Sequence, residues 1–171
     1  MLDLLYSRRS IRKYTNQLVE TEKIEQLIEA ALLSPTSRNR EAWEFIAVTD
    51  KVALKQLSIA KPGSASMLSK APLAIVVAGN PTESDVWVED CSIAAIIIQL
   101  AAQDLGLGSC WIQLRGRMYN QELSSSEYVK ELLKLPDHLE IECIISIGYP
   151  AEFKNKRDKS ELSFNKVMHR P

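Results

Sequence analysis

One continuous stretch, residues 86–105, limits what this chain can fold into more than any other part of the sequence. It has the length of a helix, is rich in good helix formers and contains neither Gly nor Pro. Wound at about 100° per residue, its polar residues Ser92, Gln99 and Gln103 form only a narrow stripe between two apolar sides. A helix of this kind must be covered on nearly all of its faces.

The two apolar sides of this helix can be assigned residue by residue. The first side holds Cys91, Ala94, Ala95, Ile98, Ala101, Ala102 and Leu105, and the second holds Ile93, Ile96, Ile97 and Leu100. A chain of 171 residues has difficulty surrounding one helix completely. Either a second copy of the chain covers one side, or the helix is the ordinary centre of a monomer. The uninterrupted apolar run 93–98 is far shorter than the roughly 20 residues that a bilayer requires, so no membrane span is expected.

Composition indicates a single domain, residues 1–171, with a substantial core. The net charge of −1 gives no electrostatic support for a nucleic-acid or anionic-membrane partner. Cys91, Cys110 and Cys143 lie in apolar surroundings without a CxxC or His/Cys cluster, so zinc is not expected. They are typical of buried free thiols in a reducing cytoplasm. The first ten residues carry Asp3 and no long apolar run, which does not suggest a secretory signal.

The remaining pattern alternates helices with about four strands. Further helices are expected at 3–8, 21–33, 51–61 and 124–135, and strands at 43–49, 73–79, 110–114 and 141–148. Ser124 and Glu127 have the spacing of a capping box, and Gly106 is placed to end the long helix in a left-handed conformation. No two strands form an obvious hairpin. We therefore predict an α+β or three-layer α/β domain with a mixed central sheet flanked by helices.

Three polar segments are candidate binding elements. Residues 8–13 carry four cations and a hydroxyl, a combination that suits an anion, although a solvated basic turn explains such a cluster more often. The loop 35–42 could offer hydroxyl and amide groups to a ligand or could simply connect two elements. The tail carries Lys154, Lys156, Arg157 and Lys159 among acids, and it could be a solvated tail or supply a second set of cations for a bound anion. The Gly106-x-Gly108 pair follows a helix, whereas a dinucleotide-binding loop follows a strand, so a Rossmann fold is not indicated.

Four landmarks in this order resemble one family over essentially the whole chain. They are RRSIRKY, PTSRNREAWEF, DCSIAAIIIQLAAQDLGLGSCWI and IISIGYPAE. The sequence is thereby similar to short single-domain members of the FMN-dependent nitroreductase superfamily. This resemblance implies an intertwined homodimer with two FMN sites at the subunit interface, in which each long central helix packs against its copy.

The resemblance also implies roles for particular residues. Arg8, Arg9 and Ser10 would hold the FMN phosphate and ribityl chain, and Arg12 would approach the N1/O2 edge, where negative charge develops on reduction. The partner subunit would contribute its own 35–39 segment, and backbone amides of the 111–114 segment would face flavin N5. A tail cation would complete the phosphate site. The full set is Arg8, Arg9, Ser10, Arg12, Pro35, Thr36, Ser37, Asn39, Trp111, Ile112, Gln113, Leu114, Lys154, Lys156 and Arg157.

The implied activity transfers a hydride from NADH or NADPH through flavin N5 to a nitroaromatic, a quinone or a similar small acceptor. Such chemistry needs no protein nucleophile. The alternatives are a dehalogenase or flavin-breakdown enzyme of the same fold, and a flavin-binding dimer without turnover. This chain departs from many members at Glu41-Ala42 and at Gln113-Leu114, and it has only small residues at 63–66. These departures concern substrate preference.

Overall fold

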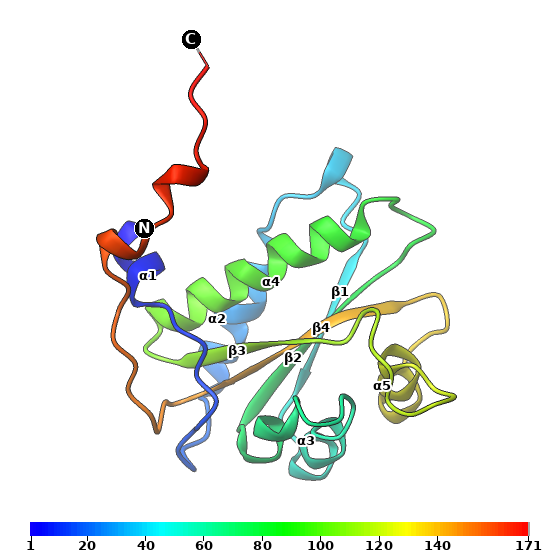
Figure 1. The fold of residues 1–171 in the computed structure, drawn as a ribbon. Coiled ribbons are helices and arrows are strands. Elements are labelled where there is room, and N and C mark those ends of the chain that lie inside the picture. The colour runs from blue at the N-terminus through cyan, green and yellow to red at the C-terminus, as the bar shows by residue number, and fades with distance from the viewer. Residues whose placement is uncertain (171) are drawn as a thin grey trace.

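The computed structural model describes residues 1–170 and has the predicted α+β architecture (Figure 1). The helices are α1 (Leu2–Ser7), α2 (Thr21–Leu32), α3 (Lys51–Leu57), α4 (Trp87–Asp104) and α5 (Ser125–Leu133). The strands are β1 (Trp43–Val48), β2 (Leu73–Gly79), β3 (Gly108–Gln113) and β4 (Glu140–Gly148). Short 3-10 turns are η1 (Ser37–Asn39), η2 (Ser66–Lys70), η3 (Lys159–Glu161) and η4 (Phe164–Lys166).

The four strands form one sheet in the order β1-β2-β4-β3. Every pair of neighbouring strands is antiparallel, although no two strands that are consecutive in the chain are joined by a tight hairpin. The parallel component of the expected mixed sheet is a single bridge between Ser10 and Ser109. β3 is an edge strand, and residues from the N-terminal segment lie along part of its outer edge.

Helices cover both faces of this sheet, which confirms the three-layer arrangement. α4 and α2 pack together on one face over a core that includes Leu27, Ile75 and Ile145. α3 and α5 cover the other face over a second core that includes Leu57, Val76 and Ile144. β2 is buried on both faces, as its continuous apolar sequence requires.

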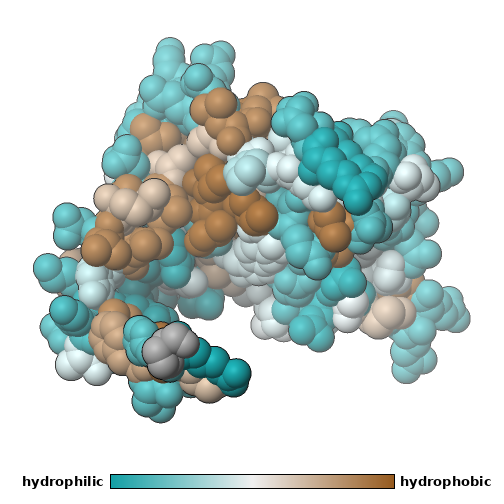
Figure 2. All heavy atoms as spheres, turned by 90° about the horizontal axis from the view of Figure 1, so that it is seen from above, coloured by the Kyte–Doolittle hydropathy of each residue, from teal (hydrophilic) through white to brown (hydrophobic). Residues whose placement is uncertain are grey.

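α4 divides its apolar residues between sheet and surface as the sequence predicts. Ala94, Ala95 and Ile98 are fully buried against the sheet, whereas Ile93 and Ile96 are 39% and 37% exposed. Apolar atoms gather over this upper face of the molecule, where α4 and α1 lie (Figure 2). Within one chain, therefore, the second side of the long helix remains uncovered.

The N-terminal segment and the tail that follows β4 lie side by side at the C-terminal end of α4 (Figure 1). The amide of Ile11 donates to Ser109 at 2.9 Å, and the amide of Ala151 donates to Lys13 at 2.9 Å. A β-carbon at Gly108 would lie 2.7 Å from Cβ of Ile11, so only glycine allows this approach without a shift. The N-terminal segment is thus held between the β3 edge and the C-terminal tail.

Several local predictions are confirmed. Ser124 and Glu127 form the capping box at the start of α5, and Gly106 has a φ of 75° after α4. Cys91, Cys110 and Cys143 are buried and free. Burial raises the pKa of Cys91 to about 12, which keeps its thiol neutral.

The predicted element ends differ by a few residues for identifiable reasons. α3 ends at Leu57 instead of continuing to residue 61, because the next residues form tighter turns that donate three residues back. α5 ends at Leu133, and the left-handed residue after it is Lys134 rather than a glycine. β3 starts at Gly108, two residues before the predicted strand.

Candidate functional site

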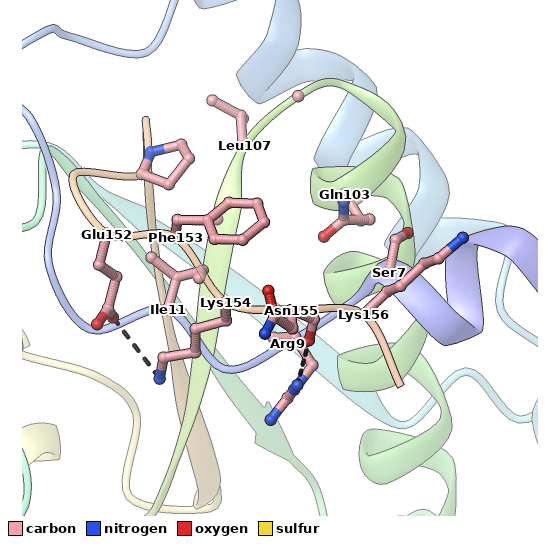
Figure 3. A pocket seen from close by; sticks show the side chains of 13 residues that line it. Ser7, Arg9, Ile11, Gln103, Leu107, Glu152, Phe153, Lys154, Asn155 and Lys156 are labelled. Carbon is pink, nitrogen blue, oxygen red and sulfur yellow. Dashed lines mark hydrogen bonds and ion pairs between the residues drawn. The ribbon is translucent and has the colours of Figure 1, made fainter. Parts of the chain in front are cut away.

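Residues from both ends of the chain form a pocket of about 630 Å³ at the C-terminal end of α4. Its lining includes Arg9 from the N-terminal segment, Lys154 and Lys156 from the tail, and Gln103 from α4 (Figure 3). Three cations in one concave site suit a ligand that carries a phosphate. The structure therefore brings together part of the predicted cation set from positions far apart in the sequence.

Hydrogen bonds to backbone carbonyls hold two of these cations. Nζ of Lys154 donates to the carbonyl of Ser10 at 2.6 Å and lies 3.7 Å from a carboxylate oxygen of Glu152. The guanidinium of Arg9 donates to the carbonyl of Asn155 (Figure 3). The charges are therefore positioned by pairing between the N-terminal segment and the tail.

Glu152 also joins the N-terminal segment to the tail. One of its carboxylate oxygens accepts from the amides of Arg12 at 2.6 Å and Lys13 at 3.2 Å. These bonds lower the pKa of Glu152, with the Arg12 amide as the main cause. Sequence reasoning missed Glu152, because a single acid within a basic tail gives no sign that it binds backbone amides 140 residues away.

The other predicted cations lie around the thiol of Cys110 on β3. Burial raises the pKa of that thiol, and the nearby charges of Arg12, Lys154 and Arg8 act in the opposite direction. Arg8, Ser10 and Arg12 therefore lie near Lys154, although they do not line the pocket itself.

Arg157 is placed differently from the other tail cations. Its amide donates to the carbonyl of Tyr6 at 2.9 Å, and it lines a neighbouring hollow beside α1. Lys156 lies between the two, because it lines both pockets. Among the tail cations, Lys154 has the most direct link to the N-terminal segment.

The predicted 111–114 segment continues the outer edge of the sheet from Cys110. The amide of Leu114, the residue that follows β3, donates to the carbonyl of Glu142 on β4 at 3.2 Å, in the register of the β3–β4 pairing. Alternate residues of an antiparallel strand donate to the same neighbour, so the amides of Trp111 and Gln113 face away from β4. The carbonyl of Ser109 agrees with this alternation, because it accepts from Ile11 outside the sheet.

Side chains in this segment divide between the two faces of the sheet, and Trp111 packs against the core on the α4 side. Ile112 and Leu114 are buried in the core beneath α3 and α5, and Trp111 and Gln113 are half-buried. Of the four predicted residues, Trp111 and Gln113 are therefore the two that can offer an edge amide to a ligand. Ile112 and Leu114 support the strand from below.

The predicted loop 35–39 lies at the opposite end of α4 (Figure 1). The amide of Ser37 donates to a carboxylate oxygen of Asp90 in the first turn of α4 at 2.9 Å, and the hydroxyl of Thr36 accepts from the amide of Glu41 at 3.1 Å. Pro35 and Asn39 are exposed. Because 18 helical residues span roughly 27 Å, these four residues do not join the cation cluster within one chain.

Sequence reasoning also missed two buried carboxylates. Asp90 is 3% exposed and holds the 35–39 loop, and Glu142 is 3% exposed beside Gln113. Asp90 precedes the apolar run of α4, and Glu142 lies between Ile141 and Cys143 in an apolar strand, so an acid at a position expected to be buried is the signal that could have found them. Within residues 1–170, no group of three His, Cys, Asp or Glu side chains is arranged to hold a metal ion. No helix in the same range could cross a membrane.

Comparisons with known proteins agree on one family. The model of the Nitroreductase family matches residues 5–60 and 53–149. A protein of Archaeoglobus fulgidus, provisionally named as an NADH dehydrogenase/NAD(P)H nitroreductase, is 38% identical over 158 residues, which cover 90% of this chain and 87% of that protein. An FMN reductase (NADPH) of Bacillus subtilis is 25% identical over 92% of this chain and 69% of its own length.

Solved structures extend this likeness to three dimensions. An FMN-dependent nitroreductase from Clostridium difficile R20291 has a TM-score of 0.98 and 48% identity, over 100% of this chain and 99% of that chain. A protein from Parabacteroides distasonis, also provisionally named as an NADH dehydrogenase/NAD(P)H nitroreductase, has a TM-score of 0.89 and 36% identity. That match covers 99% of this chain and 97% of the other.

Proposed function

Because this chain belongs to the nitroreductase family, we propose that it is an FMN-dependent oxidoreductase that uses NADH or NADPH as its reductant. The electron acceptor is a nitroaromatic, a quinone or a similar small molecule. The observation that carries this proposal is the meeting of Arg9, Lys154 and the free edge of β3 at one end of α4. We propose that the protein acts in the cytoplasm, which contains nicotinamide nucleotides and keeps thiols reduced.

The residues at this site fit the two chemical parts of FMN. Arg9, Lys154 and the nearby Arg8 and Ser10 supply the positive charge and hydrogen-bond donors that a phosphate monoester requires. Arg12 is assigned to the N1/O2 edge of the ring, where a cation stabilises developing negative charge. FMN, when bound, supplies hydride acceptance and donation at N5.

The protein's own contribution is to bind the flavin, to orient it and to shield it from water. The outward amides of Trp111 and Gln113 are assigned to N5, because amides at a fixed strand edge keep their direction without reorganisation. Hydrogen bonds to Ser10, Asn155 and Glu152 fix the cation cluster before any ligand arrives. No nucleophilic side chain is required for this reaction class.

We assign the uncovered side of α4 to a second copy of the chain. Ile93 and Ile96 on α4 are exposed, and so are Leu2 and Leu5 on α1, a helix that packs against α4. If two α4 helices pack in opposite directions, the N-terminal end of one lies beside the C-terminal end of the other. The 35–39 loop of one chain then reaches the cation cluster of its partner, which one chain alone cannot achieve.

Visible absorption spectroscopy of the purified full-length protein tests the proposal first. We expect a yellow protein whose absorption bleaches when NADH or NADPH is added without oxygen, and recovers when a quinone or nitroaromatic follows. A protein that stays colourless after FMN is added would overturn the flavin assignment and leave only the fold. Bound flavin that neither nucleotide reduces would instead indicate a binding protein without turnover.

A double substitution tests the assignment of the N-terminal cations. Replacing Arg8 and Arg12 with Ala removes two charges from the neighbourhood of Cys110 without touching the core. We expect weaker FMN binding by about tenfold or more, because charge-assisted hydrogen bonds are worth about 1.5–3 kcal/mol. A double variant that binds FMN as tightly as the unaltered protein would show that these cations serve another purpose.

A further inference from the structure

Glu142 is a buried carboxylate in the middle of the apolar strand β4. Its side chain is 5% exposed, and one of its oxygens, Oε2, has no hydrogen-bond partner in the chain. The nearest opposite charge, Arg115, lies 3.9 Å away and is itself half exposed. A carboxylate that is buried with so little compensation costs stability, so fold stability does not explain its presence.

A β-bulge directs this side chain towards α4. Val77 pairs with Cys143, but the next residue of β2, Ala78, pairs with Ile141, so Glu142 is the extra residue of β4. Ile141 belongs to the core beneath α3 and α5, whereas Cys143 belongs to the core beneath α4. Glu142 shares the α4 side with Cys143, and bulges commonly redirect a side chain in this way.

The charges and titratable groups that face Glu142 come from three elements. Glu89 and Cys91 approach from α4, Cys143 is its neighbour on β4, and Arg115 follows β3. Burial raises the pKa of the Glu142 carboxyl, while Gln113 and Arg115 oppose that rise. The strongest polar link from Glu142 to another element is therefore its bond to Gln113.

Gln113 connects this carboxylate to the flavin-facing edge of β3. The indole N–H of Trp111 donates to Oε1 of Gln113 at 2.9 Å, and Nε2 of Gln113 donates to Oε1 of Glu142 at 3.2 Å. Trp111 and Gln113, whose backbone amides point away from β4, are thus tied through the Gln113 side chain to the buried Glu142 carboxylate. They are the same two residues whose backbone amides are assigned to flavin N5.

We propose that Glu142 is a positioning residue, which acts through Gln113 to fix the direction of the edge amides that bind flavin N5. The inference rests on the proposed function and adds a residue from the strand behind the site. The hydrogen bond from Gln113 is the operative contact. A side chain at position 142 that still accepts this bond therefore preserves the function, and one that cannot accept it does not.

The test compares affinity for FMN with affinity for 5-deaza-FMN, which carries C–H in place of the N5 acceptor. Each flavin is titrated calorimetrically into full-length protein from which flavin has been removed, so the readout does not depend on turnover. The variants are Glu142→Leu, which removes the acceptor at similar bulk, and Glu142→Gln, which keeps it. Glu140→Gln is the matched control, because Glu140 lies on the same strand but bonds Ser126 and Lys130 towards α5.

We expect the unaltered protein, Glu142→Gln and Glu140→Gln to prefer FMN over 5-deaza-FMN by about tenfold, the worth of roughly one hydrogen bond. Glu142→Leu should reduce that preference to about twofold or less. Gln113→Leu breaks the same link from the other side and should lose the preference as well, which keeps the test decisive if Glu142→Leu does not fold. The double variant should lose no more than either single one.

The possible failures are distinguishable. Protein that binds neither flavin would contradict the proposed function itself. An unchanged preference in both Glu142→Leu and Gln113→Leu would overturn only the positioning role. Loss of the preference in Glu142→Gln to the same extent as in Glu142→Leu would overturn it too, because the hydrogen-bond acceptor would then not be the property that matters.

Discussion

The two ends of α4 carry the two halves of the predicted site, and they are built in opposite ways. At the C-terminal end, segments about 140 residues apart are joined by backbone pairing and by Lys154, Glu152 and Arg9. At the N-terminal end, a short loop folds back on itself and is attached to the helix through Asp90. The C-terminal end is thus a framework of long-range contacts, and the N-terminal end is a loop held by local contacts.

The backbone of the loop at the N-terminal end of α4 is also more strained than that of the framework. Arg38, Asn39 and Glu41 all have positive φ values near 50°, a region that side chains other than glycine seldom occupy. Such conformations persist where the surroundings hold them, and they concentrate at functional sites. The C-terminal framework is held by hydrogen bonds within one chain, whereas Arg38, Asn39 and Glu41 in the loop are exposed.

The largest expected effect comes from altering the helix that both ends share. Ile98→Asp places a charge in a fully buried position and should cost several kcal/mol, so that little folded protein is recovered. Ile96→Asp lies on the uncovered side and should leave a folded monomer that no longer dimerises. Analytical ultracentrifugation and circular dichroism separate the two results. A dimeric, flavin-bound Ile96→Asp protein would contradict the assigned interface.

The next test asks whether one FMN site combines the framework at the C-terminal end of α4 in one chain with the 35–39 loop of the other chain. Lys154→Met at the framework end and Asp90→Ala at the loop end should each weaken FMN binding, by about tenfold or more, because each removes a hydrogen bond to or from a charged group. Glu89→Ala is the control, because it is also an acid in the first turn of α4 but is exposed. Calorimetry gives the affinities.

Co-expression of the two variants with different tags then distinguishes shared from separate sites. If a site combines the framework of one chain with the loop of the other, a mixed dimer has one doubly altered site and one unaltered site. Tight FMN binding should therefore return at half of the sites. Mixed dimers in which every site remains weak would show that each chain completes its own site.

A smaller effect is expected where β3 meets the N-terminal segment. Gly108→Ala adds a methyl group 2.7 Å from Ile11, which must move and displace the residues that carry the cation cluster. We expect severalfold weaker FMN binding at a modest loss of stability, because small-to-large changes in packed regions typically cost about 1–3 kcal/mol. Flavin titration and thermal unfolding measure both. Unchanged affinity would show that the cations tolerate movement of this segment.

The smallest effect concerns pH and the buried Glu142. Its pKa is raised in the folded protein, so the native state favours the protonated form and loses stability as the pH rises above the unfolded value near 4.5. Glu142→Gln removes this dependence and should gain stability relative to the unaltered protein between pH 4 and pH 7. Urea unfolding at a series of pH values tests this. A constant difference across that range would contradict the raised pKa.

Sequence reasoning succeeded where the signal is local. The two apolar sides of α4, the left-handed Gly106 and the capping box at Ser124 each depend on spacing within one segment. The antiparallel order of the sheet depends on contacts between distant strands, and periodicity does not encode them. The all-antiparallel pairing of the named strands was for that reason not predicted.

The same division applies to the candidate site. Arg8 to Arg12 and the tail cations could be singled out by charge, but their joining through Glu152 and Asn155 required the fold. Nothing in the alternation of β4 reveals the bulge that turns Glu142 towards Gln113. The placement of the 35–39 loop beyond reach of the cation cluster follows only from the length of α4.

The pairing of residues 8–13 with residues 149–154 has a consequence for the order in which the protein is made. Lys154 bonds Ser10 across 144 residues, so this contact cannot form until residue 154 has been translated. At the proposed FMN site, the side chains of Glu152 and Lys154 and the carbonyl of Asn155 can therefore hold the N-terminal segment only after residues 152–155 have been added.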